Sequence, residues 1–183
     1  MNTHIALLRG INVSGYNKIK MVELKLLLES LDFHRVVTYI QSGNIVFESK
    51  IEDCSALEGL ILEAIKTKFG YEINCIVLTK EQLSRIFTSN PYLERNAIDI
   101  KKLCVTVLKT TPDLEGLAAL QQVSEASGDE FQLVGDHIFM HLPNGFARTK
   151  LTNNLVEKKL KTPATTRNWR TITKLVELSQ ASE

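Results

Sequence analysis

Cysteine is scarce in this 183-residue chain: Cys54, Cys75 and Cys104 are an odd number, with neither a CxxC spacing nor a cluster with histidine. This pattern excludes a disulfide framework, gives no basis for a zinc site and is typical of a reducing compartment. Long apolar runs are also missing. The longest, such as residues 5–8, fall far below the ~20 residues of a membrane-spanning helix. We therefore expect a cytoplasmic protein without a membrane partner.

An excess of charge of one sign is absent too, because 22 basic residues balance 21 acidic ones and the formal net charge is +1. The balance conceals a segregation along the chain. Residues 1–28 hold four basic and one acidic residue, residues 29–143 hold 10 basic and 17 acidic residues, and residues 144–174 hold eight basic residues and one acidic residue. This distribution predicts a local positive field and argues against a long polyanion bound over the whole surface.

The spacing of apolar residues predicts the same order of elements twice. Strands are expected at 5–9, 36–41, 45–47 and 73–78, then at 103–108, 131–134, 138–142 and 164–167. Helices are expected at 21–31, 57–68 and 79–87, then at 111–121, 151–156 and 169–179. The simplest interpretation is an α+β fold, a tandem duplication of two ferredoxin-like βαββαβ subdomains, each followed by an extra helix. We expect domains at 1–90 and 101–183, with 91–100 as their connection.

Topology gathers the polar loops. A β-α-β crossover makes its two strands parallel, so residues 10–18 and 41–44 are expected at one edge of the first sheet. By the same rule residues 143–150 and 167–170 share one edge of the second sheet, and we expect the two edges to face each other across the junction of the subdomains. The predicted ligand-binding residues at these edges are Arg9, Asn12, Lys18, Gln41, Ser42, Asn44, Arg148, Lys150, Arg167, Asn168 and Arg170.

Residues 10–15 follow a strand and precede a helix, as a phosphate loop does. A Walker A loop needs lysine and then serine or threonine directly after its second glycine, whereas Tyr16 and Asn17 stand there. Two interpretations stay open. The glycines and Lys18 form a weaker anion site, or the segment is only a turn that requires glycine.

Residues 41–44 and residues 148–170 also have both a ligand-binding and a purely structural interpretation. Amide and hydroxyl groups at 41–44 suit recognition of neutral polar groups of a ligand, and they suit an ordinary turn equally well. Arginines at 148, 167 and 170 match phosphate or carboxylate in bidentate fashion. Asn168 could instead cap the last helix.

Catalytic residues are not evident. His137 and His141 lie four residues apart on one expected strand, too far to share a metal easily, and no acidic pair lies in the gathered loops. No metal, cofactor or catalytic residue is therefore predicted. The RNA-recognition motif stacks bases on aromatic residues of two strands, where this chain has only Phe47. Nucleic acid stays open as a partner, but not in that mode.

Several motifs together resemble the bacterial domain of unknown function DUF1697. They are LLRGINV (7–13), NKI (17–19), TYIQSGNIVF (38–47), ARTKL (147–151) and ATTRNWRT (164–171). The resemblance runs nearly end to end and implies a tandem of two ferredoxin-like subdomains, in agreement with the periodicity. It implies no established activity. Ser14 and Asn144 depart from the pattern usual in the family.

Our leading hypothesis is that the protein binds a phosphorylated or otherwise anionic ligand between its two subdomains, with nucleotides and nucleic acid among the candidates. One alternative is an enzyme that acts on such a ligand through an arginine oxyanion clamp, so catalysis stays open. The other is a structural or interaction protein whose polar motifs only lock the subdomains together. The sequence predicts neither the oligomeric state nor the identity of the ligand.

Overall fold

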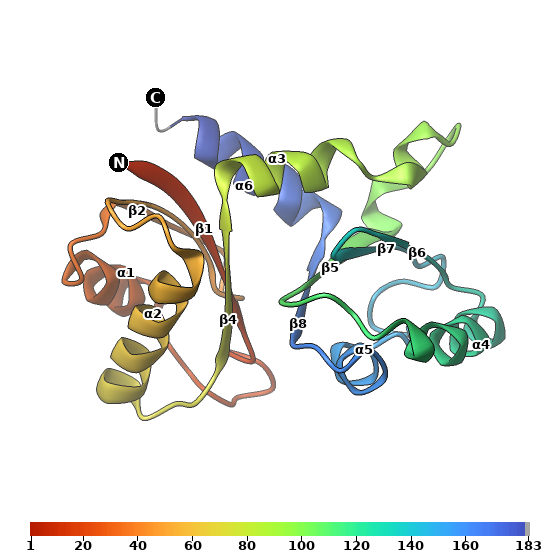
Figure 1. Ribbon diagram of the computed structural model, residues 1–183, viewed down its shortest axis with the longest axis horizontal. Helices are drawn as coiled ribbons and strands as arrows, with labels where there is room; N and C mark the ends of the chain where they lie inside the picture. Colours follow the sequence, from red (N-terminus) through yellow and green to blue (C-terminus); the bar gives the residue numbers. More distant parts are fainter. Residues whose placement is uncertain (182–183) are drawn as a thin grey trace. The chain divides into compact units, whose positions relative to one another are not determined.

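The computed structural model describes residues 1–181, and the chain divides into two compact units, each with its own sheet and core (Figure 1). Unit 1 comprises Met1–Arg85 and the chain from Lys174 onward, and unit 2 comprises Ile86–Thr173. The chain passes between the units within helix α3 (Lys80–Thr88) and again within helix α6 (Trp169–Gln180). The domain limits expected from the sequence, 1–90 and 101–183, stay a prediction.

Unit 1 is built on an antiparallel sheet in the order β2-β3-β1-β4. The strands are β1 (Asn2–Arg9), β2 (His34–Tyr39), β3 (Asn44–Ser49) and β4 (Asn74–Thr79). Helices α1 (Met21–Glu29) and α2 (Cys54–Phe69) lie on one side of this sheet (Figure 1). Because side chains alternate along a strand, Ala6 and Leu8 enter the core beneath these helices together with Ile45 and Phe47.

Two helix boundaries in unit 1 follow the signals in the sequence. The Asp53 carboxylate accepts a hydrogen bond of 2.9 Å from the Ser55 amide at the start of α2, which ends at Gly70 with a left-handed φ of 73°. At the start of α3, the Thr79 and Gln82 side chains each accept a hydrogen bond from the other residue's backbone amide, at 3.2 and 2.8 Å. This reciprocal pair of bonds is a capping box, the arrangement that a threonine followed three residues later by a glutamine favours at the start of a helix.

Unit 2 has a second antiparallel sheet, in the order β6-β7-β5-β8. Its strands are β5 (Leu103–Leu108), β6 (Glu130–Val134), β7 (His137–His141) and β8 (Ala164–Asn168). Helices α4 (Leu117–Ser127) and α5 (Asn153–Leu160) lie on one side of it (Figure 1) and bury Leu120, Val156 and Leu160 against it. Short 3₁₀ helices occur at Pro91–Glu94, Ile100–Lys102 and Leu114–Gly116.

The expected helix at 111–121 begins later than the sequence suggested. A 3₁₀ turn capped by Asp113 comes first, and α4 starts only at Leu117. The packing explains this delay, because a Cβ on Gly116 would overlap the backbone carbonyl oxygen of Lys159. The close approach of α5 therefore places glycine, a poor helix former, just before α4.

The expected α+β class is confirmed, because the protein is a mixed fold with two four-stranded antiparallel sheets and helices. Within residues 1–181, no helix has both the length and the apolar character that crossing a membrane requires.

Candidate functional site

Asn12 organises the polar end of unit 1. Its side-chain amide donates hydrogen bonds of 2.9 Å to the carbonyl oxygens of Ile19 and Gln41, and its side-chain oxygen accepts one of 2.9 Å from the Ile19 amide. These bonds join the 10–20 loop to the β2-β3 hairpin. Asn12 also adopts a left-handed φ of 53°, a conformation that asparagine tolerates better than most residues. Its side chain is therefore engaged within the unit.

The β2-β3 hairpin is held by side-chain bonds of its own. The amide of Asn44, a buried residue, donates to the Tyr39 carbonyl oxygen at 3.1 Å and to the Ser42 hydroxyl at 2.9 Å. Gly43 is buried, and its carbonyl oxygen accepts a hydrogen bond of 2.8 Å from the Leu8 amide. Two of the predicted ligand-binding residues, Ser42 and Asn44, therefore stabilise the turn that contains them.

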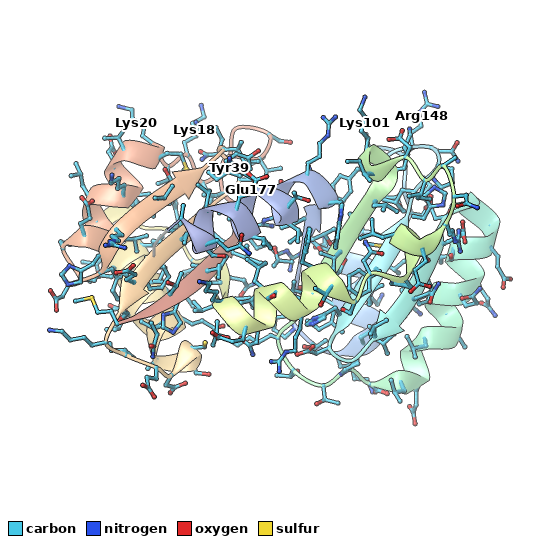
Figure 2. All side chains as sticks on the ribbon, turned by 90° about the horizontal axis from the view of Figure 1, so that it is seen from above. Lys18, Lys20, Tyr39, Lys101, Arg148 and Glu177 are labelled. Carbon is cyan, nitrogen blue, oxygen red and sulfur yellow. The ribbon has the colours of Figure 1, made fainter. Side chains whose placement is uncertain are left out.

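The cationic and amide groups of unit 1 differ in exposure. Lys18 and Gln41 are exposed, whereas Arg9 is half-buried at the end of β1. In Figure 2, Lys18 and the neighbouring Lys20 extend away from the ribbon into solvent. Lys18 forms no ion pair with any residue of the described chain. The structure thus brings Asn12 and Gln41 together and leaves the Lys18 ammonium available to a ligand.

In unit 2, Arg167, Asn168 and Arg170 do not act as a group. Arg167 is buried on β8, and its guanidinium donates to the Thr165 hydroxyl at 2.7 Å and to the Thr166 carbonyl oxygen at 3.0 Å. Asn168 caps α6, because its side-chain oxygen accepts hydrogen bonds from the Thr171 amide at 2.8 Å and hydroxyl at 2.9 Å. Arg170 is exposed. Of the two roles weighed for Asn168, the structure shows the cap.

Arg148 and Lys150, in contrast, line one groove, which we call the α4 groove. It has a volume of about 530 Å³ and is lined by Val123, Ala126, Ser127, Asn144, Arg148 and Lys150. Both cationic side chains are exposed, and neither is paired with a carboxylate of the described chain. Arg148 extends away from the ribbon in Figure 2. Both cations were predicted from the sequence. The apolar wall of the groove, formed by Val123 and Ala126 of α4, was not.

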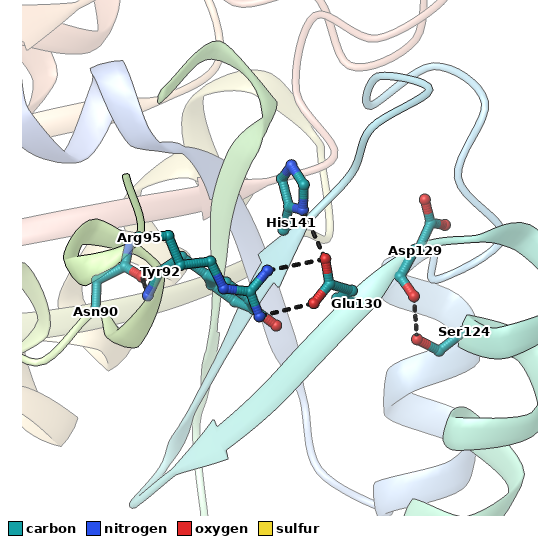
Figure 3. Close-up of polar contacts among 7 residues, drawn as sticks. All are labelled: Asn90, Tyr92, Arg95, Ser124, Asp129, Glu130 and His141. Atoms are coloured by element: carbon teal, nitrogen blue, oxygen red, sulfur yellow. Dashed lines mark hydrogen bonds and ion pairs between the residues drawn. The ribbon is translucent and has the colours of Figure 1, made fainter. Parts of the chain in front are cut away.

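A buried carboxylate lies beneath the segment that carries these cations. One oxygen of Asp129 accepts hydrogen bonds from the hydroxyls of Ser127 at 2.8 Å and Thr149 at 2.7 Å. The Asp129 carbonyl oxygen accepts a third, of 2.6 Å, from the Ser124 hydroxyl (Figure 3). Asp129 thereby ties the end of α4 to the residue between Arg148 and Lys150, and this connection fixes the backbone from which both cations extend.

Sequence reasoning missed an ionic network at the start of β6. Arg95 donates to both Glu130 carboxylate oxygens, at 3.0 and 2.8 Å, and Nδ1 of His141 lies 2.9 Å from one of them (Figure 3). The Arg95 side chain, followed by that of His141, lowers the pKa of Glu130 to about 2. The Arg95 guanidinium also lies 4.6 Å from the centre of the Tyr92 ring. Residues this far apart in sequence gave no local signal.

A second groove, of about 790 Å³, lies in unit 1 where β1 begins and β4 ends. Its lining mixes carboxylates with Arg35 and Lys80, and Arg35 pairs with Glu48 at 3.3 Å. Burial lowers the pKa of His4, which also lines the groove and whose Nδ1 lies 3.0 Å from the Asn2 carbonyl oxygen. No candidate residue from the sequence falls in this groove.

The Cys104 thiol on β5 is buried. Burial raises the pKa of the Cys104 thiol to about 12, so this residue is protonated at neutral pH and is a poor nucleophile. Across residues 1–181, no three histidine, cysteine or acidic side chains are grouped so that they could hold a metal ion.

Comparison with known proteins places the chain among proteins of unknown function. The family model described as "Protein of unknown function (DUF1697)" matches residues 1–139. A similar solved structure is that of the conserved bacterial protein SP0830 from Streptococcus pneumoniae, with a TM-score of 0.74, 23% sequence identity and coverage of 97% of this chain and 98% of that chain. At this identity the similarity concerns the fold alone. No curated protein matches the chain.

Proposed function

The chain belongs to the DUF1697 family of proteins of unknown function, and within that family we propose that it binds a small phosphorylated or otherwise anionic ligand in the α4 groove. The observation that carries this proposal is the pairing of two exposed cations, Arg148 and Lys150, with an apolar wall formed by Val123 and Ala126. A volume of about 530 Å³ falls within the usual range for small-molecule sites.

The charges of the groove favour an anion. Its six lining residues include two cations and no carboxylate. The Arg148 guanidinium presents a planar fork that matches two phosphate or carboxylate oxygens, and the Lys150 ammonium adds a point charge. Asn144 and Ser127 add neutral polar groups to the same lining. A ligand with an apolar or aromatic part beside its anionic group would contact both kinds of lining.

Binding is favoured over catalysis by the chemistry of the same residues. General acid-base catalysis needs a carboxylate, histidine or similar group within hydrogen-bond reach of the reacting atom. The lining of the groove contains no carboxylate and no histidine. The nearby carboxylate of Asp129 is buried and accepts hydrogen bonds from Ser127 and Thr149, so it does not face a ligand as a base.

We extend the proposal to the origin of the fold. Each unit runs β-α-β-β-α-β along the chain, and the two strand orders, β2-β3-β1-β4 and β6-β7-β5-β8, correspond strand by strand. This correspondence supports two ferredoxin-like subdomains that arose by tandem duplication. A cytoplasmic location is supported by the three cysteines, none of which forms a disulfide.

The test is an NMR titration of the ¹⁵N-labelled protein with inorganic phosphate and, separately, with AMP. We expect both to shift the amide resonances of Ser127, Asn144 and Arg148. AMP should bind more tightly, because its base contacts the apolar wall. In the Arg148→Ala, Lys150→Ala double variant the affinity for either probe should fall at least about tenfold, since each cation loses a charge-assisted contact.

The control is the Lys66→Ala, Lys158→Ala double variant, which removes the same net charge at exposed positions outside the groove. It should bind both probes like the native protein. Resonance shifts that avoid the groove, or equal losses of affinity in the two double variants, would overturn the proposal.

A further inference from the structure

The 10–20 loop of unit 1 ends in an exposed apolar tip, which we call the tip hairpin: Val13, Ser14, Gly15 and Tyr16. Val13 and Tyr16 form an antiparallel bridge, with a hydrogen bond of 2.9 Å from the Tyr16 amide to the Val13 carbonyl oxygen. Ser14 and Gly15 have φ values of 49° and 84°, and two left-handed central residues are typical of a tight type I′ hairpin turn. Cross-strand partners share one face, yet Val13 is 57% exposed and Tyr16 is 75% exposed.

The tip hairpin is held in place by backbone and asparagine bonds at its base. The Asn12 amide donates to the Asn17 carbonyl oxygen at 3.1 Å, and the Asn17 side chain donates to the Gly10 carbonyl oxygen at 2.8 Å. The side chain of Asn12 adds its bonds to Ile19 and Gln41. An apolar pair presented on a preformed turn loses little conformational entropy when a partner binds.

Positive charge follows the tip directly. No acidic residue occurs within residues 9–22. Lys18 and Lys20 flank the buried Ile19, and Lys20 has an extended backbone with φ −73° and ψ 133°. Alternate residues of an extended chain face the same side, about 7 Å apart. Both lysines therefore face solvent, as Figure 2 shows, and although Lys20 also lies 3.4 Å from Glu23, both ammonium groups are accessible.

We infer that the tip hairpin with Lys18 and Lys20 binds single-stranded nucleic acid. A base stacks on the exposed Tyr16 ring beside Val13, and the lysines contact the adjoining phosphates. Stacking on an aromatic ring combined with cationic contacts to the backbone is the general mode of single-strand binding, and it tolerates any base. It differs from the strand-face mode of the RNA-recognition motif. This inference goes beyond the α4 groove, because it concerns a different unit and a different ligand.

The test is fluorescence anisotropy with a labelled oligothymidylate of about 12 nucleotides at low ionic strength. Tyr16→Ala should weaken binding at least about fivefold, whereas Tyr16→Phe, which keeps the ring, should bind like the native protein. Lys18→Ala with Lys20→Ala should weaken binding and reduce the salt dependence of the affinity, because fewer counterions are released. Tyr16 is so exposed that its replacement should leave the melting temperature unchanged.

Three controls keep the inference falsifiable. Phe146→Ala removes a comparably exposed ring, 58% accessible, from unit 2, and it should not change the affinity. The Lys66→Ala, Lys158→Ala variant, which removes the same net charge at exposed positions outside the tip hairpin, should also bind the oligonucleotide normally. A blunt duplex should bind more weakly than the single strand, because its bases are already stacked. Equal affinity for the duplex, no loss in Tyr16→Ala, or binding to phosphatidylserine vesicles without binding to the oligonucleotide would overturn the inference.

Discussion

Units 1 and 2 have corresponding strand orders but hold their polar segments by different chemistry. In unit 1 the groups are neutral amides: Asn12 joins the loop after β1 to the β2-β3 hairpin, and Asn44 holds the hairpin itself. In unit 2, charged groups do much of this work, through the Arg95, Glu130 and His141 network and the buried Asp129. Neutral hydrogen bonds hardly respond to acid or salt, whereas ionic ones respond to both. Although the two units share a sheet order, we therefore expect the stability of unit 2 to respond more strongly to acid and salt than that of unit 1. Substitutions in each unit test how its polar segments are held.

The largest contrast is expected between the glycines of the two hairpins. Gly43 has φ 73°, and an added Cβ would lie 2.6 Å from Leu8 Cβ and 2.9 Å from Ile11 Cδ1. Gly43→Ala combines left-handed strain with overpacking, so we expect unit 1 to lose about 2–4 kcal/mol of unfolding free energy. Hydrogen exchange of the β1 and β3 amides measures the loss in this unit specifically.

Gly135 is the matched position in unit 2. Its φ is 61°, but an added Cβ would meet no atom within 4 Å. Gly135→Ala should therefore cost only the strain, about 1 kcal/mol, measured at the β5 and β7 amides. Equal losses in the two variants would show that overlap of the added Cβ with Leu8 and Ile11 does not add to the cost of Gly43→Ala.

The next largest effect concerns Asn12. Asn12→Ala removes three hydrogen bonds and leaves the Ile19 amide without its partner, so we expect a loss of about 2 kcal/mol from unit 1. Asn12→Gly loses the same bonds but accepts the left-handed backbone, so the difference between the variants isolates strain. In unit 2, Asn144 makes a single exposed bond of 3.3 Å to Ser127, and Asn144→Ala should cost less than about 0.5 kcal/mol. A loss for Asn144→Ala as large as that for Asn12→Ala would contradict the contrast.

The sequence predicted the fold better than the site, for a physical reason. Strand and helix positions follow from local periodicity and capping, as at Asp53 and Thr79. The adjacency of Asn12 and Gln41 followed from the parallel direction of β1 and β2. Exposure does not follow from such rules: Arg167 and Arg148 are both arginines at an expected sheet edge, yet one is buried and the other lines a groove.

The elements missed by the sequence were those that depend on side-chain partners far along the chain. Arg95 and Glu130 meet across 35 residues, and neither lies in a motif. The apolar wall of the α4 groove was equally hidden, because Val123 and Ala126 were assigned to no motif. The part of α4 that lines the groove depends on the position of the loop that carries Asn144 and Arg148, and local sequence patterns do not predict that position.

The smallest expected effect tests the acid sensitivity of unit 2. The pKa of Glu130 is lowered to about 2 from a usual value of about 4.5, so its ion pair stabilises the folded state fully above about pH 4.5. That contribution is lost as the pH falls toward 2, because the unfolded carboxylate is protonated first. The side chain is 43% exposed, and solvent screening therefore limits the contribution to less than about 1 kcal/mol.

Thermal melts of the native protein and of Glu130→Gln should diverge above pH 4.5 and converge toward pH 2. Glu72→Gln is the control. Glu72 pairs with Lys66 at the surface of unit 1, and that lysine lowers the pKa of the Glu72 carboxyl. Full hydration weakens this ion pair. If the melting temperature of Glu130→Gln changed with pH in the same way as that of the native protein, the network would add nothing to stability. The two units would then not differ in acid sensitivity because of this network.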